Sequence, residues 1–339
     1  MKMKKSLFVV AVAAFTLMGC TNEKNEFVGN GSEQTEIAFM PLTQVPTRVV
    51  VEGTSFPSAQ DMYVAAYDAT GGKDYFGQTT FSEATGVWKA NPPKYWPMNA
   101  ATLNFLAYTG VPSGSFFDGT HPAQKLTIAL GDNSSNQYDL MYACGRQSRA
   151  LNTAASNVSM VFKHALALIK FTVQTAADYS YGEEPSKTYP LVITSIVLTG
   201  AHYSGTYTID NSSNYTSTSS SFSTLTGTWL DGESATTAGT QANVTRTPTF
   251  DHITTTPQQV GAGILVVPDD KDDVADFTSF TINYTLDGKE YSYTHVPTSL
   301  DVHQAKKYTF AITMTLNEII ISPEVTDYVE EGSNGVTIN

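Results

Sequence analysis

The sequence contains very few cysteines and few charged residues. Only two cysteines, Cys20 and Cys144, occur among 339 residues, so no disulfide framework is expected. Charged residues make up 15% of the chain, below the roughly 25% of an average soluble domain. The polar surface must therefore come largely from Ser, Thr, Asn, Gln and Gly. The net charge is −13, and because an acidic surface repels phosphate backbones, nucleic acid is excluded as an expected partner.

Long apolar runs are absent outside the N-terminus. Residues 6–18, SLFVVAVAAFTLM, follow the basic start MKMKK and are shorter than the roughly 20 residues that a membrane-spanning helix needs. A basic start followed by a short apolar run is typical of a secretory signal peptide. We therefore expect an exported chain whose mature part has no transmembrane helix.

The apolar run ends in Leu17-Met18-Gly19-Cys20, which resembles the bacterial lipobox. This pattern predicts a lipoprotein signal peptide over residues 1–19 and lipidation of Cys20, as by palmitate. The alternative is an ordinary signal peptide with a chance cysteine at its end. Several acyl chains would hold the protein stably on a membrane, which a single chain would not. The polar residues 21–35 that follow predict a flexible tether.

From Val49 onwards, apolar residues alternate with threonine and other polar residues, which is typical of β-strands. Ahead of this region, EIAFMPL predicts a short first strand. TINYTLDGKEYSYTHV predicts a hairpin, because Asp287-Gly288 suits the positive φ angles of a type I′ turn. VSMVFKHALALIKFTVQ is long enough for a helix, but its alternation favours a strand over residues 166–173. Short strands between Gly, Pro and Asn turns favour β-sandwiches over βαβ units.

Two polar segments interrupt this pattern. Residues 145–157 are small and polar, and we expect a domain boundary there. Residues 210–245 contain little apolar sequence and are either disordered or a decorated loop or edge of the second domain; the interspersed aromatic residues favour the loop or edge.

No pattern of catalytic or metal-binding residues stands out. The six histidines form no i, i+2 or i, i+4 pair, so there is no zinc-binding motif, and GxSxG and glycine-rich phosphate loops are absent as well. PDDKDDVADF lacks the glycine and glutamate of a calcium loop, which favours a solvated loop. Cys144 lies among apolar residues and is expected to be buried rather than nucleophilic. We expect no catalytic residue, no metal and no cofactor, and not an enzyme.

The chain contains 18 tyrosines and 3 tryptophans. Such residues suit either sugar-stacking platforms or half-buried cross-strand pairs in a β-sandwich. We favour the structural role.

Several segments, in order along the chain, resemble the fimbrillin-like proteins of the Bacteroidales. They are TRVVVEGTSFPSAQDMYVAAY, YWPMNAATLNFLAYTGV, YDLMYA, FKHALALIKFTV and AKKYTFAITM, and with the lipobox they run through most of residues 17–316. In the last segment Ala305 stands where the family has glycine. The resemblance implies an all-β fold of two transthyretin-like β-sandwich domains in tandem, at residues 49–156 and 157–339.

The resemblance also implies a structural subunit of a type V pilus, or fimbria, that supports surface adhesion. The lipidated precursor would reach the cell outer membrane, where an arginine-specific protease would cut after Arg48 and make Val49 the new N-terminus. The alternative is a surface arginine with no role in processing. The cut would remove residues 20–48, which hold the tether and the first strand, and open a groove. A C-terminal strand of another fimbrial subunit would fill the groove by donor-strand exchange and so extend a cell-surface fimbria.

The C-terminal tail departs from the family pattern. In SPEVTDYVEEGSNGVTIN, Tyr328 stands near the place of a family tryptophan, and Glu330-Glu331-Gly332 interrupt the alternation expected of a donor strand. Shaft, anchor and tip positions in the pilus therefore stay open. The alternative function is a tip adhesin or a lipid-anchored outer-membrane glycan-binding protein, with host or bacterial surface glycans or proteins as partners.

Overall fold

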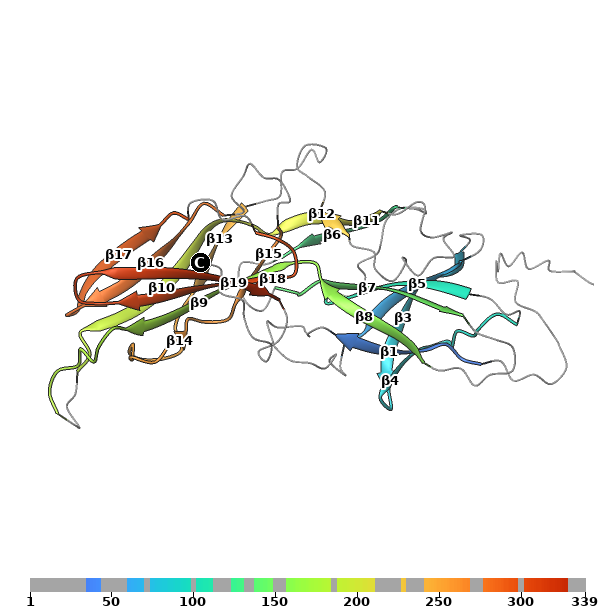
Figure 1. The fold of residues 1–339 in the computed structure, drawn as a ribbon, viewed down its shortest axis with the longest axis horizontal. Helices are drawn as coiled ribbons and strands as arrows, with labels where there is room; N and C mark the ends of the chain where they lie inside the picture. Colours follow the sequence, from blue (N-terminus) through green and yellow to red (C-terminus); the bar gives the residue numbers. More distant parts are fainter. Residues whose placement is uncertain are drawn as a thin grey trace, which may run out of the picture. The chain divides into compact units, whose positions relative to one another are not determined.

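The structure is a computed structural model and describes residues 35–43, 60–69, 74–98, 102–111, 123–130, 137–148, 157–183, 188–210, 227–229, 241–268, 277–297 and 302–328. All of them lie in the compact unit Thr35–Asn339. They form strands, turns and bends, and within these ranges there is no helix (Figure 1). The predicted all-β fold is confirmed. A search of the described residues for a helix able to cross a membrane finds none.

The first sheet closes on itself into a seven-stranded barrel. In spatial order its strands are β1 (Ala38–Thr43), β4 (Val87–Ala90), β3 (Asp74–Ala84), β2 (Met62–Asp68), β5 (Thr102–Thr109), β7 (Met141–Ser148) and β8 (Val158–His164). A period of two sets the faces of each strand: in β8, Val158 and Met160 are buried, whereas Ser159 and Val161 are exposed. The predicted first strand is confirmed as β1, which closes the ring.

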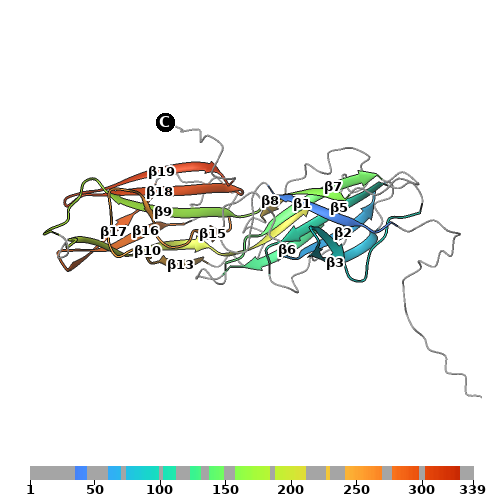
Figure 2. The same cartoon turned by 90° about the horizontal axis from the view of Figure 1, so that it is seen from below.

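Three further sheets complete the described fold (Figure 2). The four-stranded sheet consists of β13 (Gln241–Arg246), β10 (Leu191–His202), β16 (Ser279–Leu286) and β17 (Lys289–His295). The five-stranded sheet consists of β14 (Gln258–Gln259), β9 (Ala167–Thr175), β18 (Lys306–Met314), β19 (Ile319–Asp327) and β15 (Ile264–Val266). The three-stranded sheet consists of β12 (Thr228–Trp229), β11 (Ser204–Asp210) and β6 (Ala123–Ala129).

The predicted hairpin at Asp287-Gly288 is confirmed. It joins β16 to β17, and its two turn residues have φ angles of 51° and 74°. The turn between β3 and β4 has the same form, with φ angles of 56° at Thr85 and 82° at Gly86. Positive φ angles at both central residues match the right-handed twist of the strands, which explains why these sequences turn where they do.

The stretch VSMVFKHALALIKFTVQ, residues 158–174, forms strands rather than a helix. Its second half is β9, which pairs in parallel with β18 and in antiparallel fashion with β14 and β15. Every second side chain of β9 enters the core between the four-stranded and five-stranded sheets, as Phe171 and Val173 do. The strand expected over residues 166–173 is confirmed.

Strands from both sides of residue 156 share sheets. β8 belongs to the barrel, and β6 pairs with β11 along its whole length, from Ala123 opposite Asp210 to Ala129 opposite Ser204. One buried cluster joins the barrel to the three-stranded sheet and includes Tyr108 of the barrel and Tyr207 of β11. The division into domains at 49–156 and 157–339, and the tandem transthyretin-like form of those domains, stay predictions.

Candidate functional site

Strand β1 occupies the seam of the barrel. It runs parallel to β8, from Phe39 opposite Val158 to Thr43 opposite Phe162. On its other side it runs antiparallel to β4 over two residue pairs, Ala38 with Lys89 and Phe39 with Trp88. Because β1 is the only bridge between β4 and β8 among the described strands, its removal would leave both as edges with unpaired backbone groups.

Side chains at the start of β1 lie in the interior of the barrel. Ile37, immediately before β1, and Phe39 are fully buried, whereas Met40 is 47% exposed. The ring of Phe39 meets Phe81 and Phe105 edge to face, with centroid distances of 4.9 and 5.2 Å. Burial of one such side chain stabilises a fold by about 1.5–3 kcal/mol. The apolar side chains beneath β1 therefore add to the hold of its two backbone ladders.

Polar contacts fix the start of β1. The backbone N–H of Ile37 donates to the carbonyl of Lys94 at 2.7 Å, and that of Trp96 donates to the carbonyl of Thr35 at 2.9 Å. An ion pair joins Lys89 Nζ to Glu36 Oε2 at 2.6 Å, with both side chains partly exposed. All these partners come from the β4 end of the barrel, far from β1 in sequence.

The predicted site residues Cys20, Arg48 and Val49 lie outside the described residues. Lipidation of Cys20 and cleavage after Arg48 therefore stay predictions. The strand that the cut would release is described, and it is the seam of the barrel.

The second element of the site is β19, at the C-terminal end of the described chain. It pairs with β18 from Met314 opposite Ile319 to Lys306 opposite Asp327. No second partner strand is found for it among the described strands, and most of its side chains are exposed. β19 is therefore a long edge strand with one free side.

Tyr328 follows β19 directly and ends it in a buried polar cluster. Its hydroxyl donates to Asp139 Oδ2 at 2.8 Å, and its ring stacks on His164 with a centroid distance of 3.8 Å. His164 Nδ1 lies 3.0 Å from the other carboxylate oxygen of Asp139. All three side chains are at most 2% exposed. This cluster ties the chain after β19 to the two ends of β7 and β8 that meet at His164.

Sequence reasoning anticipated only part of this cluster. The apolar surroundings of His164 in VSMVFKHALALIKFTVQ predict a core or interface histidine with a hydrogen-bonded ring, which is confirmed. LGDNSSNQYD, which ends at Asp139, predicts only a turn and gives no sign that this carboxylate is buried. Tyr328 was noted only for its place in the tail. The three residues are 25 and 164 positions apart along the chain, and no local pattern links them.

Ala305 adopts a left-handed backbone conformation, with φ of 58°. Its N–H donates to the carbonyl of Leu166 at 2.9 Å, and its carbonyl accepts from the N–H of Tyr328 at 2.7 Å. The turn before β18 thus holds both the start of β9 and the end of β19. A left-handed residue there favours glycine, which gives a physical reason for the glycine of the family motif.

Cys144 is a buried free thiol. Burial raises its pKa to about 12, against a small opposing effect of Lys163. At neutral pH the side chain is therefore a protonated thiol without nucleophilic character. A search of the described residues for groups of three or more His, Cys, Asp or Glu side chains able to hold a metal ion finds none.

Residues 47–327 match the family of fimbrillin-like proteins. The chain belongs to this family. The match begins after β1 and ends just before Tyr328, so it covers the barrel without its seam strand. Membership of this family supports a fimbrial subunit on a cell-surface appendage, which assembles with other fimbrial subunits.

Solved structures are similar to this fimbrillin-like chain in fold. A fimbrial protein from Bacteroides vulgatus has 13% identity and a TM-score of 0.55, over 86% of this chain and 99% of that one. A candidate cell adhesion protein from Bacteroides uniformis has 16% identity and a TM-score of 0.53, over 87% of this chain and 98% of that one. At such identities the likeness is evidence for the fold alone. Among curated proteins, none matches this chain.

Proposed function

We propose that this fimbrillin-like chain is a structural subunit of a type V fimbria that polymerises by donor-strand exchange. The observation that carries the proposal is the position of β1. It closes the barrel and fills its core, yet the stretch that matches the family starts at residue 47, after it. A strand that is buried in the precursor but outside the family's common part is suited to be a temporary plug.

The proposed sequence of events starts with export and acylation of Cys20, which anchors the precursor in the outer membrane. An arginine-specific protease cuts after Arg48, and β1 leaves with residues 20–48. The edges of β4 and β8 and the apolar floor under Phe39 are then exposed, which is costly in water. A strand from the C-terminal tail of another subunit pairs with both edges and covers the floor.

Head-to-tail repetition of this contact does not close on itself and therefore builds a filament. β19 suits the donor role in part, because it is an edge strand whose loss would leave the core between the large sheets mostly covered: its side chains are mainly exposed. The buried contacts of Tyr328 oppose its release. The donor segment is accordingly expected to begin after Tyr328, within residues 329–339, or to require release of that side chain.

The test treats the full-length chain with an arginine-specific protease and follows its N-terminal sequence and its assembly by electron microscopy. We expect Val49 as the new N-terminus and filaments after the cut. Arg48→Lys is the matched control, because it keeps the charge and removes the recognised residue; it should show no new N-terminus at Val49 and should stay monomeric. Arg246 should resist the protease, since it is 5% exposed and donates to the carbonyl of Ala262 at 2.9 Å.

Two outcomes would count against the proposal. A cut chain that stays monomeric would argue against strand exchange, and filaments formed by a chain that lacks residues 329–339 would exclude that segment as the donor. A different new N-terminus would move the processing site away from Arg48.

A further inference from the structure

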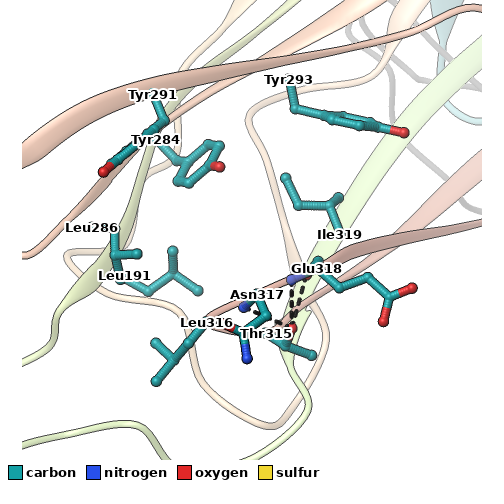
Figure 3. A pocket seen from close by; sticks show the side chains of 10 residues that line it. All are labelled: Leu191, Tyr284, Leu286, Tyr291, Tyr293, Thr315, Leu316, Asn317, Glu318 and Ile319. Atoms are coloured by element: carbon teal, nitrogen blue, oxygen red, sulfur yellow. Dashed lines mark hydrogen bonds between the residues drawn. The ribbon is translucent and has the colours of Figure 1, made fainter.

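The core between the two large sheets opens into a pocket at one end. Along β16 the side chains that face this core are buried at Phe280 and Ile282 and half-buried at Tyr284 and Leu286. The pocket lies at the Tyr284 and Leu286 end of β16 and has a volume of about 590 Å³. It is lined by three tyrosines, by leucine and isoleucine side chains, and by residues 315–318 of the turn between β18 and β19 (Figure 3).

The tyrosines present aromatic surface to solvent. Tyr291 and Tyr293, on the edge strand β17, are 39% and 37% exposed. Tyr291 stacks on Tyr284 of β16, with a centroid distance of 5.6 Å and an interplanar angle of 19°. Since these two residues are directly opposite each other in the ladder, the sheet holds the pair in place.

The turn opposite the tyrosines is held rigid and offers polar groups. Thr315 Oγ1 accepts from the backbone N–H of Asn317 at 3.2 Å and of Glu318 at 2.8 Å. These bonds occupy the hydroxyl of Thr315, while the amide of Asn317 and the carboxylate of Glu318 have no hydrogen-bond partner among the described residues. A pre-formed pocket with apolar walls and a few fixed polar groups is the usual form of a small-ligand site.

We propose that this pocket binds a neutral pyranose, as a terminal sugar of a surface glycan. A pyranose has apolar C–H faces that pack on aromatic rings and equatorial hydroxyls that pair with amide and carboxylate groups. Tyr293 and the Tyr284–Tyr291 pair supply the first kind of surface, and Asn317 and Glu318 supply the second. The volume lies within the usual 300–1,000 Å³ of ligand pockets and suits one or two sugar rings.

Charge selects against acidic sugars. Glu318 is the one carboxylate in the lining, and neither lysine nor arginine lines the pocket. The Lys289 ammonium lies 5.2 Å from the ring centroid of Tyr291, close to the pocket but outside its lining. The Glu318 carboxylate within the lining and the net charge of −13 oppose this cation and would repel a sialylated or sulfated ligand. This inference is independent of how the subunits assemble.

Saturation-transfer NMR on the purified full-length chain tests the proposal. The probes are methyl α-mannopyranoside, methyl β-galactopyranoside and, as the acidic comparison, sialyllactose. We expect saturation of the ring-face protons of at least one neutral probe, with Kd of about 1 mM, and no signal from sialyllactose. Tyr293→Ala should weaken this binding at least about tenfold, a loss of about 1.4 kcal/mol.

Tyr95→Ala is the matched control, because Tyr95 is 38% exposed but lies on the barrel; it should bind as the unchanged chain does. Leu316→Glu, on the exposed turn, provides a second variant with the β17 strand intact and should weaken binding similarly. No binding of either neutral probe, preference for sialyllactose, or equal binding by Tyr293→Ala and the unchanged chain would overturn the proposal. Filament formation lost in Tyr293→Ala without any sugar binding would assign the pocket to subunit contacts instead.

Discussion

The two strands at the proposed assembly site, β1 and β19, are held in opposite ways. β1 is short, has a neighbour on both sides and buries its aromatic side chain in the barrel. β19 is long, has one neighbour and exposes most of its side chains, and a single buried tyrosine fixes its end. The difference teaches that β1 is held by two backbone ladders and by the apolar side chains beneath it, whereas β19 is held by one backbone ladder and by its last contact.

The largest expected effect comes from the apolar hold on β1. Phe39→Ala should lower the free energy of unfolding of the full-length chain by about 3–5 kcal/mol, because it empties the space between Phe81 and Phe105. Urea denaturation measures the change. Met40→Ala is the control in the same strand, since Met40 is 47% exposed, and it should change stability by no more than about 0.5 kcal/mol. Equal effects of the two would show that β1 is not anchored through its inner face.

A smaller effect is expected at the end of β19. Tyr328→Phe keeps the ring stacked on His164 but leaves Asp139 Oδ2 without its donor, which should cost about 1–3 kcal/mol. Hydrogen exchange should show faster opening of β19 amides. Asp327→Asn, which breaks only the exposed ion pair with Lys306, should cost less than about 1 kcal/mol. If the amides of β19 exchanged at the same rate in both variants, the buried cluster would not be what anchors this strand.

A substitution at Ala305, in the turn that holds the start of β9 and the end of β19, should raise the free energy of unfolding rather than lower it. Ala305→Gly should raise the free energy of unfolding by about 1 kcal/mol, because glycine adopts the φ of 58° at Ala305 without strain. Ala311→Gly, at an exposed position within β18, is the control and should lower it by about 0.5–1 kcal/mol. A loss of stability in Ala305→Gly would contradict this account of the turn.

The smallest expected effect is an absence of reaction. Cys144 shares a buried cluster with Tyr328, and its pKa of about 12 predicts no labelling by iodoacetamide in the folded chain at pH 8. Unfolding returns the thiol to its ordinary pKa of about 8.5, so the denatured chain should be labelled. Between about pH 8.5 and 12 the unfolded chain binds fewer protons than the folded one, so stability should fall as pH rises. Labelling of folded Tyr328→Ala, but not of the unchanged chain, would report loosening of this cluster.

Local features of the fold were predictable from the sequence, whereas which strands pair with each other was not. The alternation of Ile37 and Phe39 indicates a strand at β1, and Asp287-Gly288 indicates the β16–β17 hairpin, because side-chain period and turn conformation are local properties. The pairing of β6 with β11 and of β1 with β8 depends on strands about 80 to 120 residues apart. The Asp139–His164–Tyr328 cluster also joins residues that are far apart in the sequence, so no local motif predicts it. The tyrosine content of the sequence allows sugar-stacking platforms as well as structural cross-strand pairs, but it does not locate the pocket.

The mixed pairing of β1 gives strand replacement a direction. Its longer ladder, with β8, is parallel, and its shorter one, with β4, is antiparallel. A replacement strand that ran the opposite way would turn the longer ladder, of five residue pairs, antiparallel and the shorter one, of two pairs, parallel. Because antiparallel pairing is slightly more stable per residue, the reversal would stabilise the replacement strand at β8 more than it would weaken it at β4.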